Sequence, residues 1–281
     1  MKNLGYYNGT VSELENLTVS ANDRAFYFGD GVYDAVMCRN NIPYLLFEHI
    51  ERLYKNCARL SIFVPISEME LYDLICNLVK EVDADEKFVY FHISRGSALR
   101  AHSCMPKKGN LCIMITPQKI ENIKSKMKAI LIPDNRYNYC DVKTLNLLPN
   151  VLAAQNAERE ESDEAIFHRN GIVTEGTHCN VSIILNGKIV TAPADCHILP
   201  GVTRAHLIKE AKKMGIEVEE RGYNISELKM AEEVLITSSS KLLKAVDTLD
   251  GNPIGGKNPE LLERLQERLL EDYLTATKSA I

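Results

Sequence analysis

The chain has 281 residues, a formal net charge of −5 and a sequence pI near 5.9; 45% of its residues are hydrophobic and 25% are charged. This length suffices for two ordinary domains, and the composition is that of a soluble globular protein. The acidic balance argues against a general nucleic-acid surface, and no apolar run approaches the length of a membrane span.

Targeting signals and metal motifs are not evident. The N-terminal stretch has no apolar core of a secretory signal, and none of the eight cysteines forms a CxxC pair. We therefore expect a cytoplasmic protein with reduced thiols, and the cysteine spacing predicts neither a zinc knuckle nor a redox pair nor any other metal site.

The first half mixes helices and strands. Residues 44–62 show roughly helical apolar spacing through Leu46, Ile50, Leu53, Ala58 and Leu60. Residues 67–82 predict a second helix, with Ser67 as N-cap and Glu70 completing a capping box. Apolar runs at 87–96 and 110–117 predict strands.

The second half begins after a polar, proline-containing stretch, where we place a linker. Strands are predicted at 127–134, 164–176, 180–193 and 233–240, and helices at 200–215 and 258–274. Two Asn-Gly pairs inside the strand segments predict hairpin turns. We therefore expect a two-domain α/β (α+β) chain, with domains at 1–117 and 127–281 and the linker at 118–126.

Lys143 stands among apolar and small polar residues in "CDVKTLNLLPN". Three interpretations remain open: an amine reaching solvent at a strand edge, an ion pair with Asp141, or a neutral, shielded amine that acts as a nucleophile. Glu175, in "IVTEG", is either a turn residue or a carboxylate that holds a cation or a protonated ring nitrogen.

Two polar loops suit a phosphate. In "LPGVTR" the backbone N–H groups of Val202 and Thr203 begin a helix, and "ITSSS" ends an apolar strand in serines. An ordinary helix cap and an ordinary polar loop are the alternatives.

A carboxylate clamp is a third possibility. Arg100 and His102 alternate in "LRAH", so in an extended segment both side chains point the same way. A solvated basic loop is the alternative. Tyr33, in "GDGVYDAV", either packs in a core or presents its hydroxyl to a ligand. An amine, a carboxylate, a phosphate cradle and a carboxylate clamp together fit pyridoxal 5′-phosphate and an amino-acid substrate.

The ordered set of "DRAFYFGDGVYDAV", "EHIERLY", "SRGSALRAHS", "DVKTLNLLPNVLAAQNA", "EAIFHRNGIVTEG", "ILPGVTR" and "ITSSS" spans nearly the whole chain. It resembles the fold-type IV pyridoxal-phosphate aminotransferases, and among them most closely the D-amino-acid (D-alanine) transaminases. The resemblance implies a two-domain architecture with the active site between the domains, and a homodimer without nucleic-acid or membrane partners. It also implies transfer of an amino group from D-alanine to 2-oxoglutarate, giving pyruvate and D-glutamate.

The resemblance also implies residue roles. Lys143 would form the Schiff base with the cofactor and move the proton at the substrate Cα, and Glu175 would keep the pyridine nitrogen protonated. Other cofactor contacts would come from Arg52, Leu199, Val202, Thr203, Ser238 and Ser239. The substrate α-carboxylate would be held by Tyr33, Arg100 and His102, the last two from the partner subunit.

The sequence departs from the D-alanine enzymes at Thr177, His178 and Cys179, where those enzymes carry small serines, and at Pro149 and Asn150. These differences bear on substrate range. The rival activities are a branched-chain L-amino-acid aminotransferase and an aminodeoxychorismate lyase of the same fold. A cofactor-free Schiff-base lyase and a non-enzymatic binding protein are further alternatives.

Overall fold

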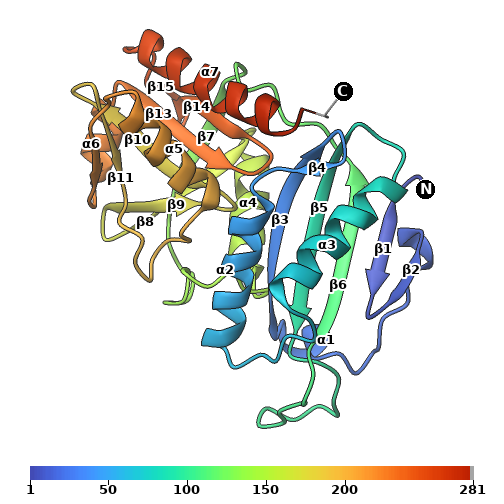
Figure 1. Cartoon of the computed structure of the whole chain (residues 1–281). Coiled ribbons are helices and arrows are strands. Elements are labelled where there is room, and N and C mark those ends of the chain that lie inside the picture. The colour runs from blue at the N-terminus through green and yellow to red at the C-terminus, as the bar shows by residue number, and fades with distance from the viewer. Residues whose placement is uncertain (279–281) are drawn as a thin grey trace. The chain divides into compact units, whose positions relative to one another are not determined.

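The structure is a computed structural model that describes residues 1–278 (Figure 1). The chain forms two compact units. Among the described residues, unit 1 contains Met1–Ile120, the short segment Val142–Asn146 and residues 273–278, and unit 2 contains Glu121–Asp141 and Leu147–Asp272. Each unit has its own sheet and helices, which confirms the predicted mixed α/β class.

Unit 1 is built on a six-stranded antiparallel sheet. In spatial order its strands are β2 (Thr10–Ser12), β1 (Leu4–Tyr7), β6 (Asn110–Pro117), β5 (Glu86–Ser94), β3 (Gly31–Arg39) and β4 (Ile42–Pro43). Helices α2 (Leu46–Arg59) and α3 (Glu68–Leu78) lie across one face of this sheet (Figure 1). The short helices are η1 (Leu14–Asn16), α1 (Arg24–Phe28) and η2 (Val79–Glu81).

The two predicted helices of unit 1 are confirmed. Ser67 and Glu70 form the expected reciprocal capping box at the start of α3. One residue of the apolar spacing in α2 does not face the core: Ala58 is exposed, and Cys57 is buried instead. Cys57 lies one helical turn after Leu53, whereas Ala58 is rotated a further 100° or so away from that face.

Unit 2 contains a mixed sheet. Its strands in spatial order are β12 (Val218–Glu220), β11 (Lys188–Thr191), β10 (Asn180–Leu185), β13 (Glu233–Ser238), β14 (Leu242–Leu249), β7 (Met127–Pro133), β8 (Glu164–Arg169) and β9 (Ile172–Gly176), with β15 (Asn252–Pro253) paired to β14. The helices are α4 (Leu148–Arg159), α5 (Val202–Lys213), α6 (Ile225–Met230) and α7 (Pro259–Ala276).

The predicted hairpins β8–β9 and β10–β11 are confirmed. Their turns place Asn170–Gly171 and Asn186–Gly187 at positive φ, which Asn and Gly tolerate best. Three strand pairs are parallel instead of hairpin-linked: β7–β8, β7–β14 and β11–β12. None of the helices within residues 1–278 has both the length and the apolar character needed to cross a membrane.

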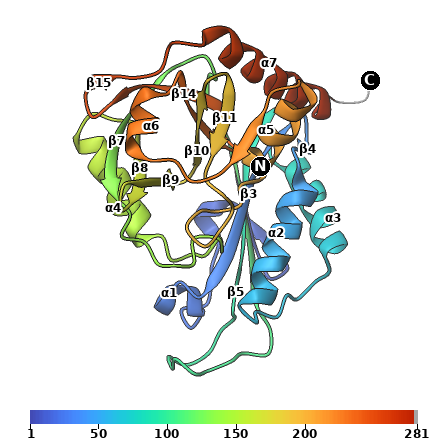
Figure 2. The ribbon, with the colours of Figure 1, turned by 90° about the vertical axis from the view of Figure 1, so that its left-hand side faces the viewer.

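Helix α4 was not predicted. It lies against β7 and β8 (Figure 2). Its buried residues are the small Ala153 and Ala157. Its large apolar residues Leu148, Val151 and Leu152 are exposed. The usual pattern, in which large apolar residues mark the buried face of a helix, is therefore reversed here.

Candidate active site

The segment that carries Lys143 pairs with the start of β3 in unit 1. The Tyr33 N–H donates to the Lys143 carbonyl (2.9 Å), and the Leu145 N–H donates to the Gly31 carbonyl (3.0 Å). Gly31 permits this approach, because a Cβ there would lie 2.8 Å from the Leu145 side chain and 2.7 Å from the Ile93 carbonyl. The lysine backbone is thus held by the sheet although the segment is irregular.

The Lys143 side chain is half-buried, and its Nζ lies 4.2 Å from the centroid of the Tyr33 ring. Tyr33 in turn stacks on Tyr90, with 5.4 Å between ring centroids. An ammonium over a tyrosine face gains a cation–π attraction. The structure therefore brings together two of the residues singled out in the sequence, the amine and the tyrosine.

A buried charge cluster lies in the same unit. Asp34, on β3, has no exposed surface and accepts hydrogen bonds from Arg52 Nε (2.9 Å) and Nη2 (2.8 Å). His49 Nδ1 lies 2.6 Å from the same carboxylate. Burial alone would raise the pKa of Asp34, but Arg52 and His49 outweigh it and hold that pKa well below its usual range. The pKa of His49 is lowered by burial, against the attraction of Asp34.

This cluster determines how Arg52 is presented. The i, i+3 spacing of His49 and Arg52 on α2 places both on the face that meets β3. The bidentate contact with Asp34 fixes the plane of the guanidinium. Arg52 therefore has less side-chain conformational freedom to lose when it binds a ligand. Arg52 is thereby a pre-oriented cation in the unit that holds Lys143.

The Arg100–His102 segment is not extended, contrary to the expectation. It forms bends and a turn, because Arg24 Nη1 and Nη2 bind the carbonyls of Ala101 (2.6 Å) and His102 (3.3 Å) and curl the chain around the arginine. The two side chains nevertheless converge on one ring. The Arg100 guanidinium lies 5.2 Å from the Phe28 centroid, and the His102 ring lies 5.1 Å from it.

In unit 2, Glu175 lies at the end of β9 and is buried. Its Oε1 accepts from Arg136 Nη1 (2.5 Å), and its Oε2 accepts from Asn180 Nδ2 (3.0 Å) and the Leu199 N–H (3.0 Å). Asn180 Nδ2 also donates to the Leu199 carbonyl (2.9 Å). Three donors therefore hold the Glu175 carboxylate in one orientation. A glutamate that served only as a turn residue in solvent would not need these three hydrogen bonds.

Arg136 is the centre of this network. It forms a fork on Asp134, with Nε to Oδ1 at 3.0 Å and Nη2 to Oδ2 at 2.8 Å, and Nη2 also donates to the His197 carbonyl (3.2 Å). Burial would raise the pKa of Asp134, but Arg136 and Arg169 lower it to about 2. The pKa of Arg136 is raised by Asp134 and Glu175 despite its burial. Asp134 and Arg136 are therefore both charged near neutral pH.

The two polar loops that were expected to bind a phosphate also lie in unit 2. Helix α5 begins at Val202 after Gly201, which has no side chain to cap the first N–H groups. A Cβ at residue 201 would lie 2.0 Å from Asn180 Oδ1, so glycine is needed for the close approach. Ser238 ends β13, and Ser239 lies in the turn that follows. The neighbouring Thr237 Oγ1 is buried without a hydrogen-bond partner.

His178 has partners on both ring nitrogens. Nδ1 lies 2.9 Å from Thr177 Oγ1 and 3.4 Å from the buried carboxylate of Glu164, and Nε2 lies 3.0 Å from Lys241 Nζ. Lys241 in turn pairs with Glu121 (3.1 Å). The residue that departs from the family pattern is thus part of a charged chain of side chains, and half of its own side chain is exposed.

The sequence analysis did not identify four residues that orient the candidate cofactor-binding side chains Arg52 and Glu175: Asp34, His49, Arg136 and Asn180. A signal was available for Asp34, which is a carboxylate inside the apolar run of β3, and for His49, which is one turn from Arg52. Arg136 lies two residues from Asp134 and Asn180 lies five residues from Glu175, but neither spacing by itself shows that the side chains meet.

Comparison with known proteins identifies the family. A model of the family described as Amino-transferase class IV matches residues 31–247. The chain therefore belongs to the class IV aminotransferases, whose cofactor is pyridoxal phosphate.

The named relatives and the similar solved structures carry different substrate names. The chain is 35% identical over 276 residues to a D-alanine aminotransferase from Listeria monocytogenes, with 96% of each sequence covered. It is 34% identical over 280 residues to one from Bacillus licheniformis, with 98% of this chain and 99% of the relative covered. A branched-chain amino acid aminotransferase from Escherichia coli has a similar structure, with a TM-score of 0.89, 22% identity and coverage of 99% and 97%. At that identity the likeness shows the fold alone.

The donor set fits the family's cofactor. A pyridinium nitrogen suits a buried, ionised carboxylate such as Glu175, and a phosphate suits uncapped helix N–H groups with an unpartnered hydroxyl nearby, Thr237 Oγ1. One similar structure, a T.th. branched-chain amino acid aminotransferase with a TM-score of 0.85 and 24% identity, is complexed with N-(5′-phosphopyridoxyl)-L-glutamate; 98% of this chain and 94% of that chain are covered.

Proposed function

We propose that this aminotransferase acts on D-amino acids, transferring the amino group of D-alanine to 2-oxoglutarate to give pyruvate and D-glutamate. The observation that carries this proposal is the similarity of 34–35% identity over nearly the whole chain to relatives named D-alanine aminotransferase. The Arg100–His102 pair supports it, because a guanidinium and an imidazole gathered on one ring supply several donors for a carboxylate.

Lys143 is the proposed catalytic residue. Pyridoxal phosphate, when bound, supplies an aldehyde for the lysine and a ring that withdraws electrons from the substrate Cα. Lys143 holds the cofactor and then carries the proton at Cα, a task for which its backbone is fixed by β3 and its amine lies over Tyr33. Arg52, held by Asp34, binds the phosphate.

Unit 2 supplies the proposed electrostatic tuning. Glu175 presents its negative charge to the ring nitrogen and keeps that nitrogen protonated, with Arg136, Asn180 and the Leu199 N–H holding the carboxylate in place. Leu199 packs on the ring. The remaining phosphate contacts are proposed for Val202, Thr203, Ser238 and Ser239.

The substrate α-carboxylate is proposed to bind Tyr33, Arg100 and His102. The active enzyme is proposed to be a homodimer in which Arg100 and His102 act in the partner's site, so that both copies are needed for each site. The domain division at 1–117 and 127–281, with a linker at 118–126, stays a prediction from the sequence; the two compact units differ from it because unit 1 also contains Val142–Asn146 and the end of α7.

The test is a comparison of amino donors with 2-oxoglutarate as acceptor. D-alanine should yield pyruvate and D-glutamate at a rate well above that for L-leucine, and Arg100→Ala should raise KM for D-alanine at least tenfold. Lys107→Ala is the matched control, because Lys107 is an exposed cation of the same loop. Faster turnover of L-leucine than of D-alanine would refute D-specificity and favour the branched-chain activity.

A further inference from the structure

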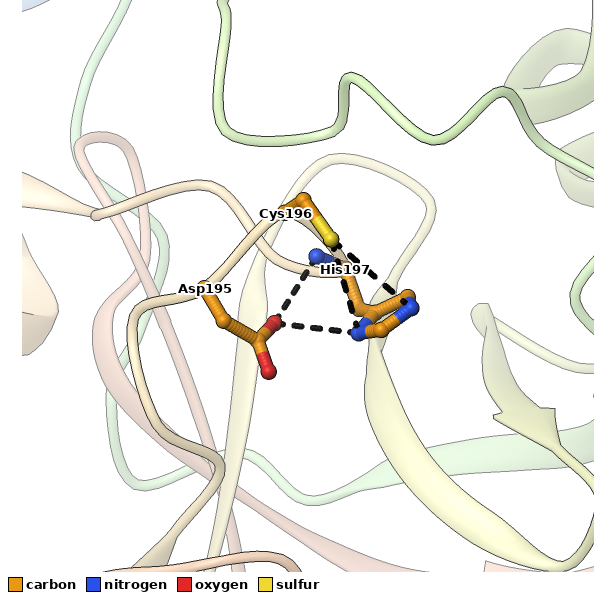
Figure 3. A group of neighbouring side chains, drawn as sticks. All are labelled: Asp195, Cys196 and His197. Carbon is orange, nitrogen blue, oxygen red and sulfur yellow. Dashed lines mark hydrogen bonds and ion pairs between the residues drawn. The ribbon is translucent and has the colours of Figure 1, made fainter.

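Three metal-ligating side chains gather on the loop between β11 and α5, as Figure 3 shows: Asp195, Cys196 and His197. A carboxylate oxygen, a thiol sulfur and an imidazole nitrogen of this group all lie within 4.8 Å of one another. Asp195 Oδ1 accepts the His197 backbone N–H (2.8 Å), which fixes the carboxylate beside the imidazole.

The distances fit one small cation. His197 Nδ1 lies 3.2 Å from Asp195 Oδ1 and 3.9 Å from Cys196 Sγ. In a tetrahedral zinc centre with Zn–N and Zn–O bonds of about 2.0 Å and a Zn–S bond of about 2.3 Å, the N···O separation is about 3.3 Å and the N···S separation about 3.5 Å. The two edges that include His197 Nδ1 are therefore within about 0.4 Å of the required lengths, and the third pair of donors, the Asp195 carboxylate and Cys196 Sγ, lies within 4.8 Å.

We propose that this loop binds one soft or borderline divalent cation, such as Zn²⁺, through Asp195, Cys196 and His197, with water in the fourth position. On binding, the Cys196 thiol loses its proton to solvent and the His197 imidazole is neutral, because only those forms offer a lone pair. Thiolate and imidazole ligands favour Zn²⁺ over Mg²⁺ or Ca²⁺, which prefer oxygen.

The fourth position is not filled by the neighbouring cysteine. The Cys140 N–H donates to the Cys196 carbonyl (3.1 Å), but the Cys140 thiol donates to the Tyr137 carbonyl (3.0 Å). Cys140 is therefore the matched control, a second thiol beside the site with a different partner.

The metal site and Glu175 share one short stretch of backbone. The His197 carbonyl accepts from Arg136, which binds Glu175 Oε1, and the Leu199 N–H donates to Glu175 Oε2. A cation that draws the Cys196 and His197 side chains together pulls on residues that hold this carboxylate. Metal binding should therefore alter the environment of the cofactor ring, so the site is regulatory and not a part of the transamination chemistry.

The experiment is a titration of the holoenzyme with Cd²⁺, followed by the ultraviolet absorption of the Cd–thiolate bond, and with Zn²⁺, followed by calorimetry. Wild type and Cys140→Ser should each bind one ion per chain at this site. Cys196→Ser and His197→Gln should each weaken binding about a hundredfold or more, because removing a ligand costs at least as much as removing its supporting partner.

Two outcomes would overturn the proposal. One is unchanged stoichiometry and affinity in both Cys196→Ser and His197→Gln; the other is loss of binding in Cys140→Ser alone. The coupling to Glu175 has its own readout. Zn²⁺ should shift the visible absorption band of the bound cofactor in wild type but not in Cys196→Ser, and metal binding without this difference would refute the coupling. The metal titration does not depend on which amino acid the enzyme uses.

Discussion

Replacing Arg136 with methionine removes a cation that contacts both Asp134 and Glu175. The side chains of these two carboxylates are 0% and 6% exposed, so neither can regain its lost partner from solvent without local opening. Removing one partner of a buried ion pair typically costs about 3–5 kcal/mol of unfolding free energy. Methionine has a similar length, so little packing is lost.

The remaining partners set the expected value within that range. Asp134 keeps Arg169 Nε and Thr174 Oγ1, both at 3.1 Å, and Glu175 keeps its Asn180 and Leu199 donors. We therefore expect a loss near the lower limit, about 3 kcal/mol. The measurement is urea unfolding of the apoprotein, so that cofactor binding does not contribute to stability. The slope of unfolding free energy against urea concentration is compared with that of wild type, so that a change in midpoint reports a change in stability.

Two further variants separate charge from geometry. Arg136→Lys keeps the charge but loses the fork and should lose about half as much, since charged hydrogen bonds are worth about 1.5–3 kcal/mol each. Arg169→Met should lose only about 1 kcal/mol, because Arg169 is partly exposed and contacts Asp134 through a single nitrogen, Nε. A loss below about 1 kcal/mol for Arg136→Met would refute the assignment of Arg136 as the central cation.

The same variant has a pH signature. The pKa of Asp134 is depressed to about 2, so its charge stabilises the folded state above its usual pKa of 3.8, and this contribution is lost as the pH falls through about 2. Without Arg136 the folded-state pKa rises, so the variant's remaining contribution from Asp134 should disappear at higher pH than in wild type. Stability curves measured between pH 6 and pH 2 that keep the same shape would contradict this.

Three other predictions concern catalysis. Borohydride reduction of the holoenzyme should attach the cofactor to the peptide containing Lys143, and mass spectrometry that places the label elsewhere would reject this lysine. Glu175→Gln should retain cofactor but slow the first half-reaction about ten- to a hundredfold, because a charged hydrogen bond is worth about 1.5–3 kcal/mol; undiminished turnover would leave Glu175 with a purely structural role. If Lys143→Ala and Arg100→Ala chains are refolded together, random pairing should restore about a quarter of wild-type activity, since half of the dimers would contain one intact site of two. No recovery, with mixed dimers verified by mass, would mean that each site is built from a single chain.

The local pattern of the sequence was sufficient for about half of the regular elements, and strands such as β1 and β14 were not predicted. The capping box of Ser67 and Glu70, the Asn-Gly turns and the alternating apolar strands depend on residues a few positions apart, and each is confirmed. The ordered motifs were likewise sufficient for the family, because they lie along the chain and need no fold to be read. Helix α4 was not predicted, because its buried face is made of alanines and so lacks a pattern of large apolar residues.

Only the tertiary structure decided how the side chains of the candidate site are oriented. Lys143 is held by β3, more than a hundred residues earlier, and Arg136 meets Glu175 across 39 positions. The Arg100–His102 turn depends on Arg24, which lies 77 positions from the Ala101 carbonyl that it binds. No periodicity of the sequence encodes such pairings. Hydrogen bonds and ion pairs between distant residues form only where the fold brings two segments together, after several strands and helices between them. The kind of chemistry could therefore be predicted from the residue types. The burial, charge state and orientation of each side chain, by contrast, arise from long-range packing.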